Sequence, residues 1–395
     1  MFVGGKGGFI VIMTTSYSNV LKIEFSTMRP DEFNADIRSL DTLADGRRIV
    51  LGTAISELFE LSTTDVKITS NSRFDKDAIN KGVFSMNSFD RFEMWGLAVF
   101  RTQENAGKFI TVSDDGYLRI WSVNDRERKM EGFVELHANS KNIPDPYSDD
   151  ARLRCVAISP KEDFAAVGCK SGAIRVRSVL TKIVNLKEQK QIQIFEDPRG
   201  CIRELKYSPN GNYLAVGCDN NALEIYSVPD YKRRANLKKH SGPVIHIDWS
   251  SDSKYLMTNS ESQELLFFSM QDFQHITDPP ANIRNEHWST HNCVYNWSTQ
   301  GIWRKHMKLG SEIYAADRTN GKFFDEYQTI ATGDDFGEIR VYKYPCVQPA
   351  AESVICKGHS SFVSNLKWMP DESRLITVGG EDQTIIVWRL HRSLF

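Results

Sequence analysis

The sequence lacks a continuous apolar run of the length that a membrane-spanning helix requires, about 18 residues or more. It also lacks a secretory signal, because the apolar stretch at residues 1–13 is interrupted by Gly4-Gly5-Lys6-Gly7-Gly8. No helix follows this glycine-rich piece to offer its N-terminus to a phosphate, so we interpret it as a turn between strands. We therefore expect a cytoplasmic protein with no membrane partner.

An excess of charge of one sign is also missing. Forty-nine basic and 51 acidic residues leave a formal net charge of −2. A chain this close to neutrality has no overall field that would attract a nucleic acid. We therefore expect no nucleic-acid partner, and any electrostatic recognition must come from a local patch.

Signatures of catalysis and of metal binding are missing as well. The 7 cysteines form no C-x-x-C pair, the 9 histidines form no H-E-x-x-H pair, and neither G-x-S-x-G nor G-x-x-x-x-G-K-[ST] occurs. The paired carboxylates Asp114-Asp115 and Asp334-Asp335 recur in the same turn of two repeats, which favours a structural role. The sequence therefore predicts reduced thiols, no enzyme activity, no catalytic residue, no metal and no cofactor.

Helical periodicity is absent, and strand patterns take its place. The stretch from His359 to Trp388 contains three short runs rich in Val, Ile, Leu and Trp, separated by Pro-Asp-Glu-Ser and Gly-Gly-Glu-Asp. Apolar runs of this kind between turn signals are typical of antiparallel strands. Similar units fill the chain, and their closing strands end at Met13, Leu61, Trp121, Arg177, Tyr226, Phe268, Tyr342 and Trp388.

The spacing of these units predicts the architecture. Successive closing strands end between 42 and 74 residues apart, which brackets the blade of about 40–45 residues of WD-type propellers once loops are added. Blades that close radially protect their sheet edges, whereas a β-sandwich would not need so many similar units. We therefore expect an all-β, WD40-type β-propeller with seven blades, and eight blades are the alternative.

The two ends of the chain are expected to meet in this ring. The last blade, residues 359–390, lacks the pattern of an outer strand, whereas Val20–Phe25 has one. Our hypothesis is that residues 20–25 close the ring by pairing with the last blade. The predicted domains are then residues 1–18, a remnant of a preceding blade or an N-terminal extension, and the propeller at residues 19–395. If residues 1–13 pair within the ring instead, they form an eighth blade.

The units resemble the WD40 repeat. In that family a His before the inner strand, an Asp in the turn before the third strand and a Trp at the end of that strand are linked by side-chain hydrogen bonds. The resemblance implies a structural role of this kind for His240, Asp115, Trp121, Asp335, His359, Asp382 and Trp388. Other units have lost the pattern, so we expect their blades to be held by packing.

A narrower resemblance follows from one unit. Residues 297–345 contain QGIW and then ATGDDFGEIRVYKYPC, and this unit looks like the one that marks echinoderm microtubule-associated-protein-like (EMAP-like) proteins. That family carries two propellers in tandem, and this chain is similar to the C-terminal one. The resemblance implies a non-catalytic module of the cytoplasm and cytoskeleton that docks on tubulin, on microtubules or on other microtubule-associated proteins, with axonemal microtubules of the cilium or flagellum as one setting. We also expect the chain to belong to a longer protein or a larger assembly.

Basic clusters are the candidate partner-binding residues: Arg126, Arg128 and Lys129; Lys232, Arg233, Arg234, Lys238 and Lys239; and Arg304 and Lys305. Exposed clusters of this kind are attracted to acidic surfaces such as the tails of tubulin, and salt weakens the attraction. A solvated loop is the alternative interpretation of each cluster. The alternative functions are a cytosolic WD-repeat adaptor that assembles signalling or ubiquitin-transfer complexes, and an enzyme that uses the central channel, which the missing catalytic constellation disfavours.

Overall fold

The computed structural model describes the strands of the N-terminal region and most of the chain after residue 92. The described residues are 2–5, 9–13, 19–24, 37–42, 48–53, 58–62, 93–123, 128–136, 148–149, 151–178, 191–195, 200–228, 230–279, 283, 286–303, 312–321, 328–349 and 351–390. The chain divides into two compact units, Met1–Asp90 and Arg91–Phe395. No described helix is long and apolar enough to cross a membrane.

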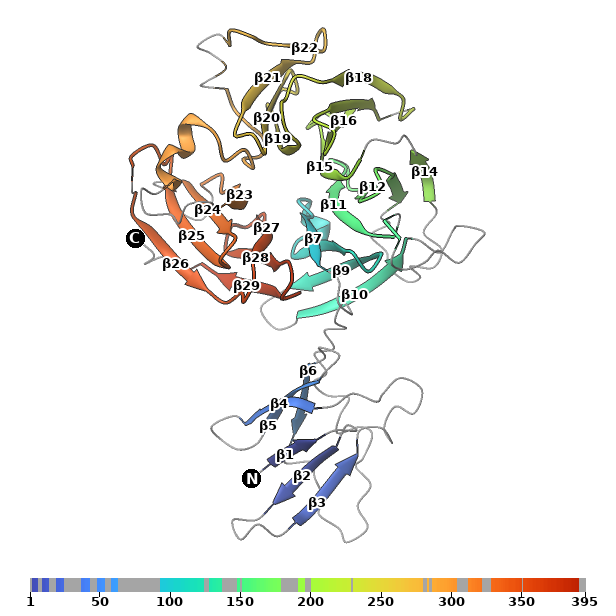
Figure 1. Ribbon diagram of the computed structural model, residues 1–395, viewed down its shortest axis with the longest axis vertical. Helices are drawn as coiled ribbons and strands as arrows, with labels where there is room; N and C mark the ends of the chain where they lie inside the picture. Colours follow the sequence, from blue (N-terminus) through green and yellow to red (C-terminus); the bar gives the residue numbers. More distant parts are fainter. Residues whose placement is uncertain are drawn as a thin grey trace. The chain divides into compact units, whose positions relative to one another are not determined.

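The C-terminal unit contains six antiparallel sheets arranged around a common axis (Figure 1). Among the described residues, five of these sheets have four strands and the last has three. The first blade contains β7 (Met94–Val99), β8 (Lys108–Ser113), β9 (Tyr117–Val123) and β10 (Arg128–Glu135), the second β11 (Leu153–Ile158), β12 (Phe164–Cys169), β13 (Ile174–Ser178) and β14 (Gln191–Phe195), and the third β15 (Ile202–Tyr207), β16 (Tyr213–Cys218), β17 (Leu223–Ser227) and β18 (Arg233–Leu237). The fourth contains β19 (Val244–Trp249), β20 (Tyr255–Ser260), β21 (Leu265–Ser269) and β22 (Gln274–His275), the fifth β23 (Ile313–Arg318), β24 (Gln328–Asp334), β25 (Glu338–Tyr344) and β26 (Ser353–Lys357), and the last β27 (Val363–Trp368), β28 (Arg374–Gly379) and β29 (Ile385–Arg389). The prediction of an all-β propeller is confirmed.

The core lies between neighbouring blades. One cluster joins Ile110 and Ile120 of the first blade to Leu153 and Val167 of the second, and all four side chains are buried. The second strand of a blade is apolar over most of its length, because both of its faces meet a neighbouring sheet. Burying each such aliphatic side chain contributes roughly 1.5–3 kcal/mol relative to leaving it in water.

The turn between the inner and second strands adds a polar link between blades. In this turn Glu162, Ser253 and Glu372 have positive φ values of 59°, 62° and 57°. Each side chain accepts a backbone N–H of the preceding blade: Glu162 that of Thr102 at 2.8 Å, Ser253 that of Asn210 at 3.1 Å, and Glu372 that of Asn320 at 2.5 Å. A buried acceptor paired with a backbone donor satisfies both groups, so these links fix the angle between successive blades.

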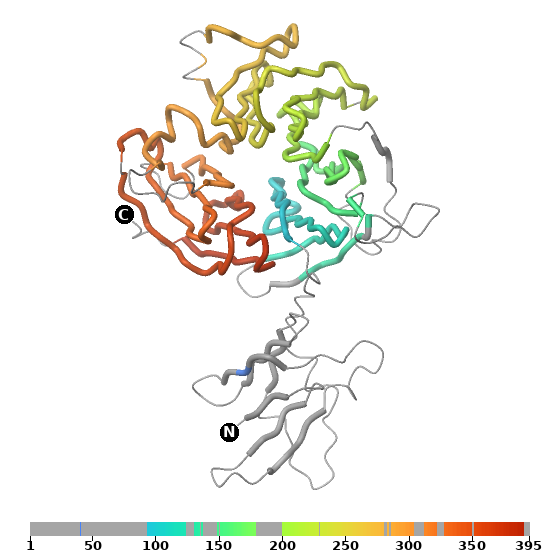
Figure 2. Tube along the Cα trace, in the orientation of Figure 1, coloured from blue at the N-terminus to red at the C-terminus, as the bar shows by residue number. Residues whose placement is uncertain are grey.

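The ring closes between its last and first blades, where β27 lies beside β7 (Figure 2). The backbone N–H of Met94 donates to the carbonyl of Gly380 at 3.1 Å. The Asn365 amide donates to the carbonyl of Trp95 at 3.3 Å. The described strands of residues 94–389 therefore form a ring of six blades.

The predicted number of seven blades is wrong. The repeat that ends at Leu61 was counted in the ring, but β4 (Ile37–Thr42), β5 (Arg48–Thr53) and β6 (Leu58–Ser62) form a sheet of the N-terminal unit. The repeat pattern is local and does not tell which unit a blade joins.

The N-terminal unit has a second three-stranded sheet, β1 (Phe2–Gly5), β2 (Phe9–Met13) and β3 (Asn19–Glu24). Most of the predicted closing strand, residues 20–25, lies in β3, which pairs with β2. The sheet β27-β28-β29 has three strands among the described residues. The proposed domain division and ring closure by residues 20–25 therefore stay predictions.

A long segment separates β22 from β23 and is held by Asp248 of β19. The Asp248 carboxylate accepts the Thr290 hydroxyl at 2.5 Å and the backbone N–H groups of Asn292 and Cys293, each at 2.8 Å. The nearby His291, together with these bonds, outweighs the opposing effect of burial and holds the Asp248 pKa below its usual value. The segment then forms the 3-10 helix η4 (Trp297–Ile302).

Candidate interaction surfaces

The best-formed side-chain network closes the last blade. His359 Nδ1 lies 3.1 Å from Asp382 Oδ2, its Nε2 lies 2.8 Å from Thr377 Oγ1, and the Trp388 indole donates to the same hydroxyl at 2.8 Å. Burial alone would raise the Asp382 pKa, but the His359 hydrogen bond and backbone donors lower it. The structure thus joins the three predicted residues through Thr377, which the motif did not include. We call this network the brace.

Two other blades have altered braces. In the first blade the Trp121 indole donates to Thr111 Oγ1 at 2.8 Å, while Asp115 pairs with Arg119 at 2.6 Å. In the fourth, His240 contacts Thr258 at 2.7 Å and Glu264 at 3.0 Å. The motif does not point to Glu264, because its Asp position falls two residues earlier, on Ser262.

The predicted role of Asp335 has no counterpart in the described contacts. Its Oδ1 is buried without a hydrogen-bond partner. The preceding Asp334 instead accepts the backbone N–H groups of Phe336 at 3.0 Å and Glu338 at 2.9 Å. Asp334 therefore shapes this turn.

Strand β18 and the residues on either side of it carry the candidate basic cluster. The side chains of Lys232, Arg233, Arg234, Lys238 and Lys239 are all exposed, and we call these residues the β18 basic surface. Arg233 lies 3.4 Å from Glu224 and Arg234 lies 3.2 Å from Asp230. No described acidic group forms an ion pair with the three lysines. These lysines therefore keep their charge for solvent or for a partner.

The position of this surface also explains part of its composition. Because β18 is the outer strand of its sheet, its free edge would otherwise offer backbone groups to another chain. Charged side chains on an edge strand oppose such pairing. The other predicted basic residues cannot be compared in the same way: Arg126, Arg304 and Lys305 lie outside the described residues, and only the backbone of Arg128 and Lys129 is described, in β10.

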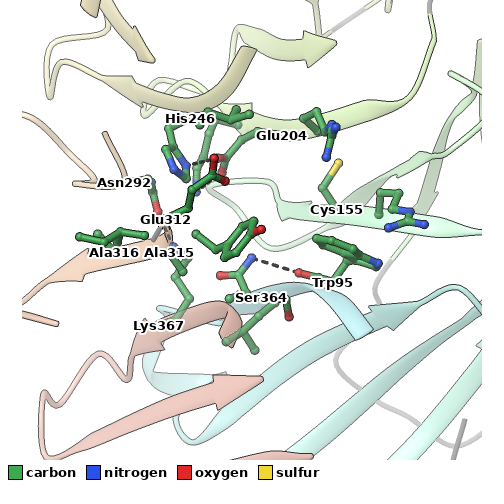
Figure 3. A pocket seen from close by; sticks show the side chains of 18 of the residues that line it. Trp95, Cys155, Glu204, His246, Asn292, Glu312, Ala315, Ala316, Ser364 and Lys367 are labelled. Carbon is green, nitrogen blue, oxygen red and sulfur yellow. Dashed lines mark hydrogen bonds and ion pairs between the residues drawn. The ribbon is translucent and has the colours of Figure 1, made fainter. Parts of the chain in front are cut away.

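The second candidate surface is a cavity of about 110 Å³ on the axis of the ring. It is lined by the inner strands of all six described blades, β7, β11, β15, β19, β23 and β27, and by residues of the segment before β23 (Figure 3). Deep inside, Glu204 lies 3.1 Å from Lys206 and 3.5 Å from His246. Lys367 donates to the Asn292 amide oxygen. Ionisable groups from three inner strands, β15, β19 and β27, thus meet in the cavity.

Burial and neighbouring charges shift the pKa values of Lys367 and Lys206 in opposite directions. Burial followed by the nearby Lys206 charge lowers the Lys367 pKa to about 8. For Lys206 the Glu204 carboxylate outweighs the opposing effect of burial and raises the pKa. Among the described residues, no cluster of three or more His, Cys, Asp or Glu side chains could hold a metal ion. The groups present can bind and orient charged side chains.

Comparison with known proteins identifies the ring. Residues 94–390 match the family model described as the echinoderm microtubule-associated protein second beta-propeller. The chain belongs to this family. The matched residues run from the first residue of β7 to the residue after β29, so the EMAP propeller and the six-bladed ring coincide.

Curated relatives extend the similarity over almost the entire chain. It is 27% identical to human echinoderm microtubule-associated protein-like 2 over 98% of its own length and 52% of that protein. It is also 27% identical to human echinoderm microtubule-associated protein-like 1, over 98% of this chain and 41% of that one. A ciliary WD repeat-containing protein, ctxp80 of Euplotoides octocarinatus, is 28% identical over 98% of this chain and 49% of that one. The chain thus spans about half the length of the EMAP-like relatives it matches.

Proposed function

We propose that this chain is a non-catalytic, microtubule-associated binding module that docks on tubulin or on other microtubule-associated proteins. The observation that carries the proposal is the match of the ring to the EMAP second propeller. The EMAP-like relatives are named as microtubule-associated proteins, and another relative is named as ciliary. We therefore propose the cytoskeleton, including the axoneme of cilia or flagella, as the place where the chain acts.

The β18 basic surface is the proposed docking element. Its three lysines, which pair with no described acidic group, present positive charge from a formed strand and its flanks, so little conformational entropy is lost when an acidic surface binds. Surface charge of this kind accelerates association and is screened by salt, with a Debye length of about 8 Å at physiological ionic strength. Binding that depends on this surface should therefore weaken as salt is added.

Co-sedimentation tests the proposal. The chain is incubated with polymerised microtubules in low salt, and its pelleted fraction is compared with that in a tubulin-free control. We expect the chain to pellet with microtubules and to be released by added salt. A chain that stays in the supernatant, alone and together with extract from ciliated cells, would contradict the proposal. Affinity capture that returns ligase or kinase subunits in place of tubulin would favour the signalling or ubiquitin-transfer adaptor.

A further inference from the structure

Three aromatic side chains from different blades gather at one mouth of the axial cavity. The Phe362 ring lies 5.3 Å from the Trp95 ring and 5.3 Å from the Tyr314 ring, measured between centroids. Tyr314 is 37% exposed although it is a large aromatic residue. Trp95 and Tyr314 line the cavity itself. The mouth therefore offers aromatic surface to an incoming group.

Carboxylates surround this aromatic group because of a position that repeats in the ring. The residue that follows the second strand donates its backbone N–H to the carbonyl of the residue before the inner strand. Asp114 donates in this way to Glu93 at 3.0 Å, and Asp335 donates to Glu312 at 3.1 Å. Asp219 and Glu261 occupy the same position in two further blades and bond to Cys201 and Pro243. The fold thus brings acidic side chains from several blades to one rim.

One side of this rim is neutralised. Arg154 lies 2.8 Å from Asp114 and 3.4 Å from Glu93, and its guanidinium covers the Trp95 ring at 4.5 Å from the centroid. Arg203 pairs with Asp219, and it lies 3.1 Å from Glu261. The arginines on this side are therefore engaged with the carboxylates that belong to it.

On the opposite side, the described residues supply no cation that neutralises the carboxylates. Glu312 is exposed, and no described cation forms an ion pair with it or with Asp335. Burial, followed by the charges of Glu312, Asp335 and Glu261, raises the Tyr314 pKa. Glu312 and Tyr314 both line the cavity. An exposed ring beside such a carboxylate attracts a cation both through its face and through the acid.

The floor of the cavity limits how deep a cation can enter. Lys206 and Lys367 line both this cavity and a second, neighbouring one, so they lie between the two. A second positive charge would be repelled there, so a guest side chain is expected to keep its charged end near the rim.

We propose that this mouth, formed by Tyr314, Phe362, Trp95 and Glu312, binds a lysine or arginine side chain of a partner polypeptide. The inference does not depend on the proposed microtubule docking. It concerns a basic partner, whereas the β18 basic surface fits an acidic one. An acidic peptide would meet carboxylates at the mouth that no described cation pairs with, and arginines that are already paired.

The test uses the full chain with its tryptophan indoles labelled with ¹⁵N and the Trp95 signal assigned by Trp95→Phe. N-acetyl-arginine methylamide is titrated while the Trp95 indole signal is followed, and the citrulline derivative serves as the uncharged probe of the same shape. We expect a saturable shift with arginine and about tenfold weaker binding with citrulline. Tyr314→Leu is expected to weaken arginine binding about tenfold. Glu312→Gln is expected to weaken it about threefold.

Glu352→Gln is the matched control, because Glu352 is an exposed carboxylate next to the outer strand β26 and far from the cavity lining in sequence. It should leave arginine binding unchanged, and the remaining indole signals should keep their positions in all variants. Absence of a saturable Trp95 shift, equal binding of arginine and citrulline, or unchanged binding in both Tyr314→Leu and Glu312→Gln would each overturn the proposal. Co-sedimentation with microtubules would be unaffected by such a failure.

Discussion

His359 and Trp388 meet at a single hydroxyl, since the His359 ring nitrogen and the Trp388 indole both lie 2.8 Å from Thr377 Oγ1. His359 precedes β27, the inner strand of the last blade, and Trp388 lies near the end of β29, its third strand. The shared contact therefore spans the sheet. In the first blade Thr111 receives only the Trp121 indole in the described contacts. Two threonines at the same blade position therefore differ in the number of partners they hold.

Replacing Thr377 with valine tests this difference. Thr377→Val keeps the side-chain shape but leaves the His359 ring nitrogen and the Trp388 indole N–H without their partner, at an expected cost of about 2–4 kcal/mol in the free energy of unfolding. Thr111→Val, which removes one partner, should cost about half as much. Urea denaturation of both variants at pH 7 provides the comparison. Equal losses would mean that the His359 contact adds nothing to the stability of the last blade.

His291 should make the chain sensitive to acid. The side chain is 2% exposed, its Nε2 lies 3.1 Å from Ser298 Oγ and 3.2 Å from the Tyr344 hydroxyl, and burial lowers its pKa to about 4. Because the unfolded chain takes up this proton near pH 6.5, the stabilisation is complete above that pH and is lost as the pH falls toward 4.

The variant His291→Phe removes the titrating group. Its free energy of unfolding should be lower than that of the parent at pH 6.5, but it should fall less between pH 6.5 and pH 4.5. The exposed His287 offers the control, since His287→Phe should keep the pH dependence of the parent. Parallel curves for the parent and His291→Phe would show that another group causes the acid sensitivity.

The outer edge of β29 should depend on residues 20–25 if the predicted closure is correct. Proline at position 21 removes a backbone donor and breaks the strand, so Leu21→Pro should increase amide hydrogen exchange in Ile385–Arg389. Val50→Pro, in β5, is the control for damage to the other sheet of the N-terminal unit. The closure is refuted when exchange in β29 is the same in Leu21→Pro as in the parent chain.

The sequence was informative about local structure. The strands around Trp121 and Trp388 were predicted because turn residues separate apolar runs, and the family resemblance rested on residues 297–345, which in the structure span η4 and β25. Glu264 was missed because the motif places its carboxylate two residues earlier, at the position of Ser262. Thr377 was missed because the motif does not include the hydroxyl that links its residues. A sequence motif can predict residues only at the positions that it specifies.

The axial cavity could not be predicted for a different reason. Trp95, Tyr314 and Phe362 lie far apart in the sequence, and they meet only because the sixth blade closes against the first. The wrong blade count has the same origin, since ring closure is a long-range event. Periodicity identifies a blade, but the number of blades depends on how all of them pack.

The central claim, docking on microtubules through the β18 basic surface, is tested most directly by one comparison of pelleted fractions. The variant Lys232→Glu, Lys238→Glu, Lys239→Glu is compared with Lys161→Glu, Lys254→Glu, Lys357→Glu, which changes the net charge equally at exposed lysines on three separate blades. We expect the first variant to stay in the supernatant at low salt and the second to pellet like the parent chain. Equal pelleting of both variants would contradict the account.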